Sequence, residues 1–205
     1  MFKNFLDLNH QDVLDHLMLT AYIAEYAEWD NHSHLERIRR YTYILASGTD
    51  VGHNEASLIS IASILHDIGK ITIPVSILKK TANLEPDEYK IAERHTVESS
   101  RLLSGSGSPI LQTAKIIART HHERWDGSGY PEGLKGEEIP FSGRIMALAD
   151  VFDALTTRRP YKTPMQPDAA CALIKESSGS LFDPKLVTIF VDRFEDFHAV
   201  LQMQS

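Results

Sequence analysis

Seven residues with metal-binding side chains stand at spacings that simple core packing does not require. Five are histidines and two are aspartates: His34, His66, Asp67, His95, His121, His122 and Asp150. Neutral imidazole and carboxylate are the usual ligands of borderline divalent metals. Neighbours on a helix project about 100° apart, so His121 and His122 are poorly placed to serve one small ion together. Two pairs of adjacent candidate ligands, His66-Asp67 and His121-His122, therefore predict more than one metal. Two metals roughly 3.5–4 Å apart are a recurrent device for hydrolysing phosphate esters.

Asp67 ends an apolar segment, ASLISIASILHD, which is typical of a buried helix. A carboxylate buried there costs several kcal/mol unless it is paired or bound to metal, so we expect Asp67 to bridge metals. The alternative for any single histidine is an ordinary hydrogen-bonded residue. We adopt that alternative for the other five, leaving only His32 open because it is near the site: His10, His16, His32, His53 and His198.

Lys70 follows His66 by four residues and shares its face if the helix continues that far. Its ammonium group is suited to protonating a departing alkoxide or neutralising charge that develops during hydrolysis. The alternative is a solvated lysine at a helix C-terminus, which the helix dipole favours.

The segment HHERWDGSGYPEGLKGEEIP (121–140) contains four glycines, which permit a ligand to approach the main chain closely. Tyr130 in this loop is suited to stacking on a nucleobase, and its alternative is a half-buried tyrosine of a surface loop. Arg158, Arg159 and Lys162 crowd a short stretch after Asp150. They suit a phosphodiester, although a solvated basic turn is their default interpretation.

The elements that position these residues are predicted to be helical, because apolar residues recur at helical spacing along most of the chain. The only short β-rich piece is ITIPV (71–75). We expect an all-α bundle of about seven to eight helices with a long Gly/Pro-rich loop at 126–140. The expected helices cover residues 10–28, 34–48, 54–69, 86–103, 109–122 and 142–156, followed by two that begin near Pro167 and Asp183-Pro184.

Composition limits the class of protein. The 205 residues and 23.1 kDa suit one domain, and no repeat or linker divides them. No apolar run approaches the roughly 18–20 residues that cross a bilayer, and the N-terminus lacks a signal peptide pattern. Cys171 is the single cysteine, which excludes an intramolecular disulfide and favours the cytoplasm. The net charge of −7 argues against general DNA or RNA binding.

Three ordered segments together resemble the HD-GYP family of cyclic di-GMP phosphodiesterases, a branch of the HD-domain metal hydrolases. They are HDIGKITIP (66–74), HHERWDGSGYPEGLKGEEIP (121–140) and RIMALADVFDALTTRRPYK (144–162). The resemblance extends over residues 24–186. We therefore expect one hydrolase domain over 1–205, with 1–23 as a helical lead-in and 187–205 as a C-terminal helix.

The resemblance implies a helical bundle with two or three divalent metals, iron or manganese, held by the seven residues named first. It implies that Lys70 and Asp67 act in catalysis and that water or hydroxide bridging the metals attacks phosphorus. The product is the linear dinucleotide pGpG, or GMP after a second cleavage. The substrate-binding residues that the resemblance implies are Gly129, Tyr130, Arg159, Lys162 and Asp153, the last at a family position near the site.

The sequence departs from the family pattern before His34. Family members with three metals usually place a glutamate four residues ahead of that histidine, where this chain has Asp30. Asp30 is therefore the candidate ligand of a third metal, with Glu28 as an alternative. The number of metals, and with it hydrolysis as far as GMP, stays open.

Two other functions remain as alternatives. One is an HD-domain hydrolase of another cyclic dinucleotide, cyclic GMP-AMP. The other is a signalling module that binds a nucleotide or a partner protein without turnover. Many family members carry a regulatory domain ahead of the hydrolase, so the chain is either a stand-alone enzyme or an excised domain. A regulatory partner and a homodimer are left open.

Overall fold

The computed structural model describes residues 10–25, 31–158 and 163–203, and this part of the chain is helical apart from one isolated β-bridge between Ser178 and Phe182. The all-α prediction is confirmed. The α-helices are α1 His10–Ala24, α2 Asn31–Ser47, α3 His53–Ser63, α4 Val75–Leu78, α5 Pro86–Leu102, α6 Pro109–Thr120, α7 Phe141–Thr156, α8 Pro167–Glu176, α9 Pro184–Asp192 and α10 Phe194–Gln202. Two 3₁₀ turns complete the described elements, η1 Ile68–Thr72 and η2 Gly136–Glu138.

Ten α-helices lie in the described residues instead of the seven to eight expected. One addition is the single-turn helix α4, which begins directly after Pro74 and takes up the end of the β-rich ITIPV segment. The other arises because the chain breaks at Arg193, between α9 and α10, where one continuous C-terminal helix was expected. None of the described helices combines the length and apolarity needed to cross a membrane.

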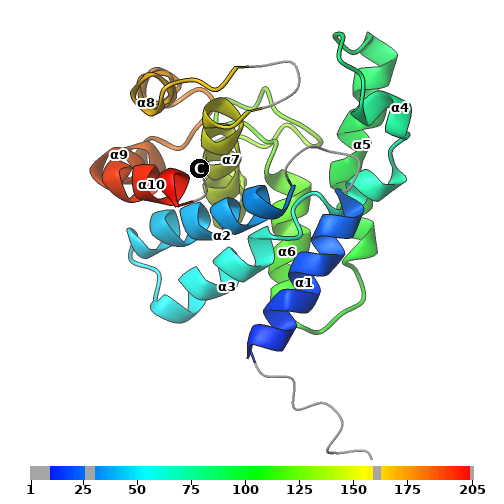
Figure 1. The fold of residues 1–205 in the computed structure, drawn as a ribbon, viewed down its shortest axis with the longest axis horizontal. Helices are drawn as coiled ribbons and strands as arrows, with labels where there is room; N and C mark the ends of the chain where they lie inside the picture. Colours follow the sequence, from blue (N-terminus) through cyan, green and yellow to red (C-terminus); the bar gives the residue numbers. More distant parts are fainter. Residues whose placement is uncertain (1–9, 26–30, 159–162, 204–205) are drawn as a thin grey trace, which may run out of the picture.

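The core is centred on α2 and α7, with α3 and α6 on one side and α8, α9 and α10 on the other (Figure 1). Tyr41 of α2 stacks on Phe197 of α10 with ring centroids 4.6 Å apart, and Phe152 of α7 meets both rings edge-on. All three side chains are fully buried. Fully burying a phenylalanine contributes roughly 1.5–3 kcal/mol, so this cluster is a principal link between the C-terminal helices and α2.

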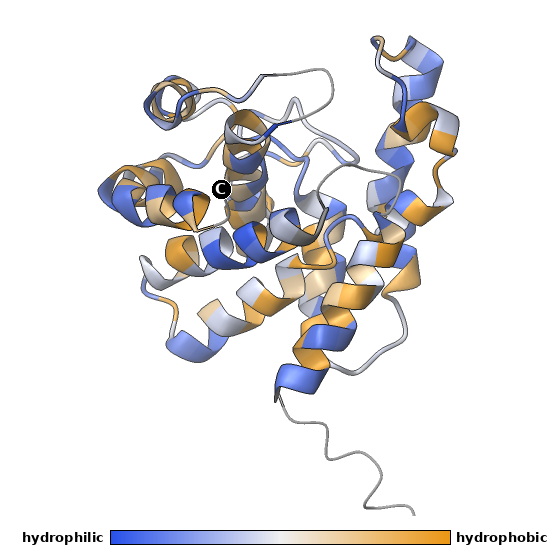
Figure 2. Cartoon of the chain, in the orientation of Figure 1, coloured by the Kyte–Doolittle hydropathy of each residue, from blue (hydrophilic) through white to orange (hydrophobic). Residues whose placement is uncertain are grey.

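Hydrophobic and hydrophilic residues are mixed around α1, α2 and α5 in Figure 2, as expected for helices with one face in the core. Helix α1 packs against α2 and against η1. This contact brings the C-terminal end of α1 beside the segment that carries His66 and Asp67, so residues of α1 enter the site region.

The end of α3 differs from the sequence prediction in a way that shapes the site. The α-helix stops at Ser63, and a turn leads into η1 with Asp67 outside the α-helical region at φ −111° and ψ 13°. Gly69 then approaches α5 so closely that a Cβ atom there would lie 2.2 Å from the carbonyl oxygen of His95. Its N–H donates to Ser99 Oγ at 2.7 Å. The close crossing therefore fixes His66 and Asp67 against His95.

Candidate metal centre

The seven predicted ligands come together from five parts of the bundle. His34 lies in the first turn of α2, His66 and Asp67 in the turn after α3, and His95 within α5; His121 and His122 close α6, and Asp150 lies in α7. Their nitrogen and oxygen atoms form two groups, and within each group the atoms lie within 4.8 Å of one another. The groups are Asp67, His95, His121 and His122 in one, and His34, His66 and Asp150 in the other.

Three of the histidines are oriented by their own chain segments. His66, His95 and His121 each place Nδ1 at a backbone carbonyl oxygen three residues earlier, at 3.0, 2.6 and 3.0 Å. A carbonyl oxygen only accepts, so each Nδ1 must carry the hydrogen and donate it. In the neutral ring, Nε2 is then the atom with the free lone pair, as in histidines that bind metal.

These lone pairs converge on the carboxylate of Asp67. The Nε2 atoms of His66, His95 and His121 lie 3.0, 3.2 and 3.5 Å from its oxygens. All three nitrogens, and Oδ1 of Asp67, are buried without a hydrogen-bond partner among the described residues. Acceptor atoms that face each other in a buried site are unfavourable unless a cation lies between them. The donor set of imidazole nitrogen and carboxylate oxygen therefore fits a borderline divalent metal.

The electrostatics favour the metal-binding forms of several groups. Burial would raise the pKa of Asp67, but Lys70 and His66 hold it well below its usual value, so the carboxylate is ionised. Burial lowers the pKa of His121, and burial and the neighbouring His121 lower that of His122, so both rings are neutral. His66 is the exception: burial would lower its pKa, but the charge of Asp67 raises it to about 9, so a metal that binds its Nε2 has to displace a proton.

Asp153 supports His34 from α7. Its carboxylate accepts from Arg37 Nε at 2.5 Å and lies 2.8 Å from His34 Nδ1. Burial opposes ionisation of Asp153, but His34 and Arg37 lower its pKa to about 2. With a side chain only 1% exposed, Asp153 is placed to orient His34 and not to touch a substrate. Arg37 was not predicted as a site residue, although its position one turn after His34 on α2 could have indicated one.

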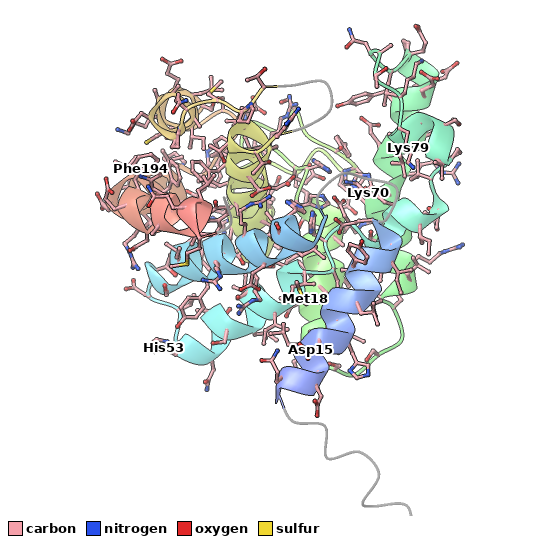
Figure 3. The ribbon with its side chains drawn as sticks, viewed as in Figure 1. Asp15, Met18, His53, Lys70, Lys79 and Phe194 are labelled. Atoms are coloured by element: carbon pink, nitrogen blue, oxygen red, sulfur yellow. The ribbon has the colours of Figure 1, made fainter. Side chains whose placement is uncertain are left out.

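Lys70 lies where a catalytic ammonium group is expected. Its Nζ is 2.6 Å from Oδ2 of Asp67, and Figure 3 places it near the C-terminal end of α1. The residue belongs to η1 and not to a continued α3, so it does not share a helical face with His66 as expected. The 3₁₀ turn instead brings it onto the side chain of Asp67, three residues earlier.

The loop after α6 folds back over the histidine doublet. The ring of Tyr130 stacks on His122 with centroids 4.8 Å apart. Gly129 passes so near the end of α6 that a Cβ atom would lie 2.4 Å from the backbone nitrogen of Arg124. Glu123, 2% exposed, accepts from the N–H groups of Glu132 and Leu134 at 2.8 and 3.0 Å. Glu123 was not predicted as a site residue, although its position directly after the two histidines could have indicated one.

Three predicted site residues, and the alternative ligand Glu28, lie outside the described part of the chain: Asp30, Arg159 and Lys162. Arg158, the last residue described before that gap, is exposed. The basic contacts to a phosphodiester and the proposed role of Asp30 therefore stay predictions.

Glu25 at the end of α1 enters the site without having been predicted. It is 1% exposed, and one of its carboxylate oxygens groups with His66 and Asp67 within 4.8 Å. Burial, partly opposed by His66, raises the pKa of Glu25 to about 7. No local sequence pattern marks Glu25, because its place in the site depends on the packing of α1 against η1.

Comparison with known proteins gives a family and a set of relatives. The HD domain family matches residues 20–186. A cyclic di-GMP phosphodiesterase of Thermotoga maritima is 47% identical over 169 residues, which cover 82% of this chain and 46% of that protein. The 3'3'-cGAMP-specific phosphodiesterase 2 of Vibrio cholerae is 42% identical over 168 residues, covering 82% of this chain and 32% of that protein.

Among solved structures, a cyclic GMP-AMP specific phosphodiesterase from V. cholerae, V-cGAP3, superimposes with a TM-score of 0.66 at 21% identity, covering 91% of this chain and 50% of that chain. At that identity the likeness concerns the fold alone. The chain spans less than half the length of the two curated relatives described above.

Proposed function

The chain belongs to the HD domain family, and on that premise we propose that it is a metal-dependent phosphodiesterase that hydrolyses cyclic di-GMP to pGpG. The observation that carries the proposal is the convergence of imidazole and carboxylate donors in two adjoining groups, with Asp67 in one and its neighbour His66 in the other. The relatives named as cyclic di-GMP phosphodiesterases support the choice of substrate.

The seven grouped residues would hold two divalent metals, and their nitrogen and oxygen donors suit iron or manganese. Such metals supply Lewis acidity and an activated water for breaking a P–O bond. Asp67 would contribute to holding both metals, because its oxygens face histidines of both groups. Asp153 and Arg37 keep the His34 ring in position through hydrogen bonds.

Lys70 and the loop after α6 act on the dinucleotide in this proposal. The ammonium group of Lys70 neutralises charge at the phosphate and gives a proton to the departing oxygen. Gly129 is proposed to contact the substrate through its main chain, and Tyr130 presents an aromatic ring beside His122. Arg159 and Lys162 are proposed to bind phosphate oxygens.

A third metal is proposed at the group formed by Glu25, His66 and Asp67. Glu25 supplies the additional carboxylate from α1, in place of the Asp30 that the family pattern suggested. Two buried carboxylates so close together repel each other, and a cation between them removes that cost. With three metals, the proposal extends to further hydrolysis of pGpG to GMP.

The experiment that tests the function is Asp67→Ala. The wild-type chain, purified anaerobically and loaded with iron(II) or manganese, should bind at least two metals per chain and linearise cyclic di-GMP. The variant should lose metal and turnover, because removing the shared carboxylate disrupts both groups. Metal analysis and product chromatography measure these outcomes, with Asp87→Asn, whose side chain is 96% exposed on α5, as control. Unchanged turnover in Asp67→Ala would contradict the mechanism.

A second candidate substrate is 3'3'-cGAMP, because relatives at 42% and 36% identity are named as phosphodiesterases specific for it. A competition assay with both cyclic dinucleotides decides between them. Preferential loss of 3'3'-cGAMP from an equimolar mixture would replace the first candidate with the second.

A further inference from the structure

A cavity of about 350 Å³ opens beside the proposed metal centre. Its inner end is lined by His95, Lys70 and Tyr130, so it is continuous with the site. Its outer end is formed by one face of α5 and by the segment that follows α4. The volume is within the roughly 300–1,000 Å³ range of small-molecule sites, and a group attached to a phosphate at the metals would extend into it.

Glu93 is the acidic residue in the lining of this cavity. It lies one turn after Tyr89 on α5 and next to Ala92, and these three residues share the face that borders the cavity. Within residues 10–25, 31–158 and 163–203, its carboxylate has neither a hydrogen bond nor an ion pair, and it belongs to none of the three ligand groups. A free carboxylate repels a phosphodiester, so a dinucleotide that enters the cavity must offer it hydrogen-bond donors.

Guanine carries such donors. Its Watson–Crick edge presents N1–H and the 2-amino group side by side, and the two oxygens of a carboxylate accept from both. Adenine presents an acceptor at N1 and has no 2-amino group, so it cannot make this pair. Lys80 also lines the cavity; its ammonium group is paired with Glu88 at 2.5 Å, and one of its two other hydrogens is suited to the guanine O6 acceptor. Tyr89 and Tyr130 offer aromatic faces for stacking.

We propose that this cavity is a guanine-binding subsite in which Glu93 recognises the base through N1–H and the 2-amino group. The proposal rests on the proposed function, because one base can reach α5 only when the phosphate attached to it lies at the metal centre. The subsite makes Glu93 a residue that determines specificity for guanine over adenine, in addition to the loop and basic residues expected to contact the dinucleotide.

The test compares kcat/KM for three cyclic dinucleotides: cyclic di-GMP, cyclic di-IMP, which lacks only the 2-amino groups, and cyclic di-AMP. The wild-type chain should prefer cyclic di-GMP to each of the others by about tenfold or more, the discrimination that a bidentate base contact supplies. In Glu93→Gln the preference for cyclic di-GMP over cyclic di-AMP should fall by about tenfold or more, because an amide matches adenine better than guanine.

Two further variants complete the design. Glu93→Ala should lose the discrimination between cyclic di-GMP and cyclic di-IMP without a gain for adenine. Asp87→Asn, exposed on the same helix outside the cavity, should keep the wild-type preferences. If both Glu93 variants hydrolyse cyclic di-GMP with wild-type preferences, the guanine subsite is wrong and the phosphodiesterase function stands. If the metal-loaded wild-type chain hydrolyses no cyclic dinucleotide, both proposals are wrong.

Discussion

At the scale of single residues, the proposed metal centre depends on histidines that are aimed by the backbone behind them. The seven residues that the structure groups could be selected from the sequence, because doublets of imidazole and carboxylate are typical of metal sites and are seldom needed for core packing. Glu25 was not predictable in the same way. Its position depends on where α1 ends against η1, and that contact between distant segments leaves no local pattern in the sequence.

The replacement of Glu25 by glutamine tests its proposed role. We expect Glu25→Gln to lower the metal content by about one ion per chain, because a neutral amide is a much weaker ligand than a carboxylate. Elemental analysis after loading with manganese and desalting measures this. Asp30→Asn is the comparison, and it should leave the metal content unchanged. Loss of an ion in Asp30→Asn but not in Glu25→Gln would return the third site to the position that the family pattern suggested.

At the scale of elements, the starting residues of helices that begin with proline were predicted well. The expected helices at 86–103 and 109–122 are found at Pro86–Leu102 and Pro109–Thr120, because a first-turn proline marks a start locally. The end of α3 was not predicted correctly, because its apolar sequence continues beyond Ser63 without a break. That end is determined by the crossing of η1 and α5, which requires a residue without a side chain at Gly69.

Gly69→Ala should therefore destabilise the protein. The added Cβ would lie 2.2 Å from the carbonyl oxygen of His95 and 2.5 Å from the backbone nitrogen of Ser99, so no side-chain rotation relieves the clash. We expect a loss of about 1–3 kcal/mol in the free energy of unfolding, measured by urea denaturation. Gly107→Ala is the matched control, because no atom lies within 4 Å of its Cβ position. Equal urea midpoints for both variants would show that η1 and α5 separate easily.

At the scale of the whole molecule, the bundle serves to bring ligands from separate helices to one place. Their gathering was expected from the resemblance, since chain order alone does not specify which helix ends meet. The packing of α10 on α2 through Phe197 and Tyr41 was not foreseen, because these residues are far apart in the sequence and each belongs to an ordinary apolar stripe. Four of the seven proposed ligands are buried, His66, Asp67, His95 and His121, so we expect metal binding and folding stability to be coupled.

Metal removal should consequently lower the melting temperature. A metal present at 100 times its dissociation constant stabilises the folded chain by about 2.7 kcal/mol. For a domain of this size that corresponds to a shift of roughly 5–10 °C, measured by differential scanning fluorimetry with manganese and with EDTA. Asp67→Ala should melt at the same temperature under both conditions. A wild-type chain equally insensitive to metal would argue against a core that contains the ions.

The attachment of the loop after α6 has a bearing on how such proteins diversify. Glu123 holds this loop by two peptide N–H groups, those of residues 132 and 134, and by none of its side chains. Every amino acid except proline offers the same N–H. At these two positions the side chain can thus change while the path of the loop is kept, and new ligand preferences can evolve on an old scaffold without dismantling it.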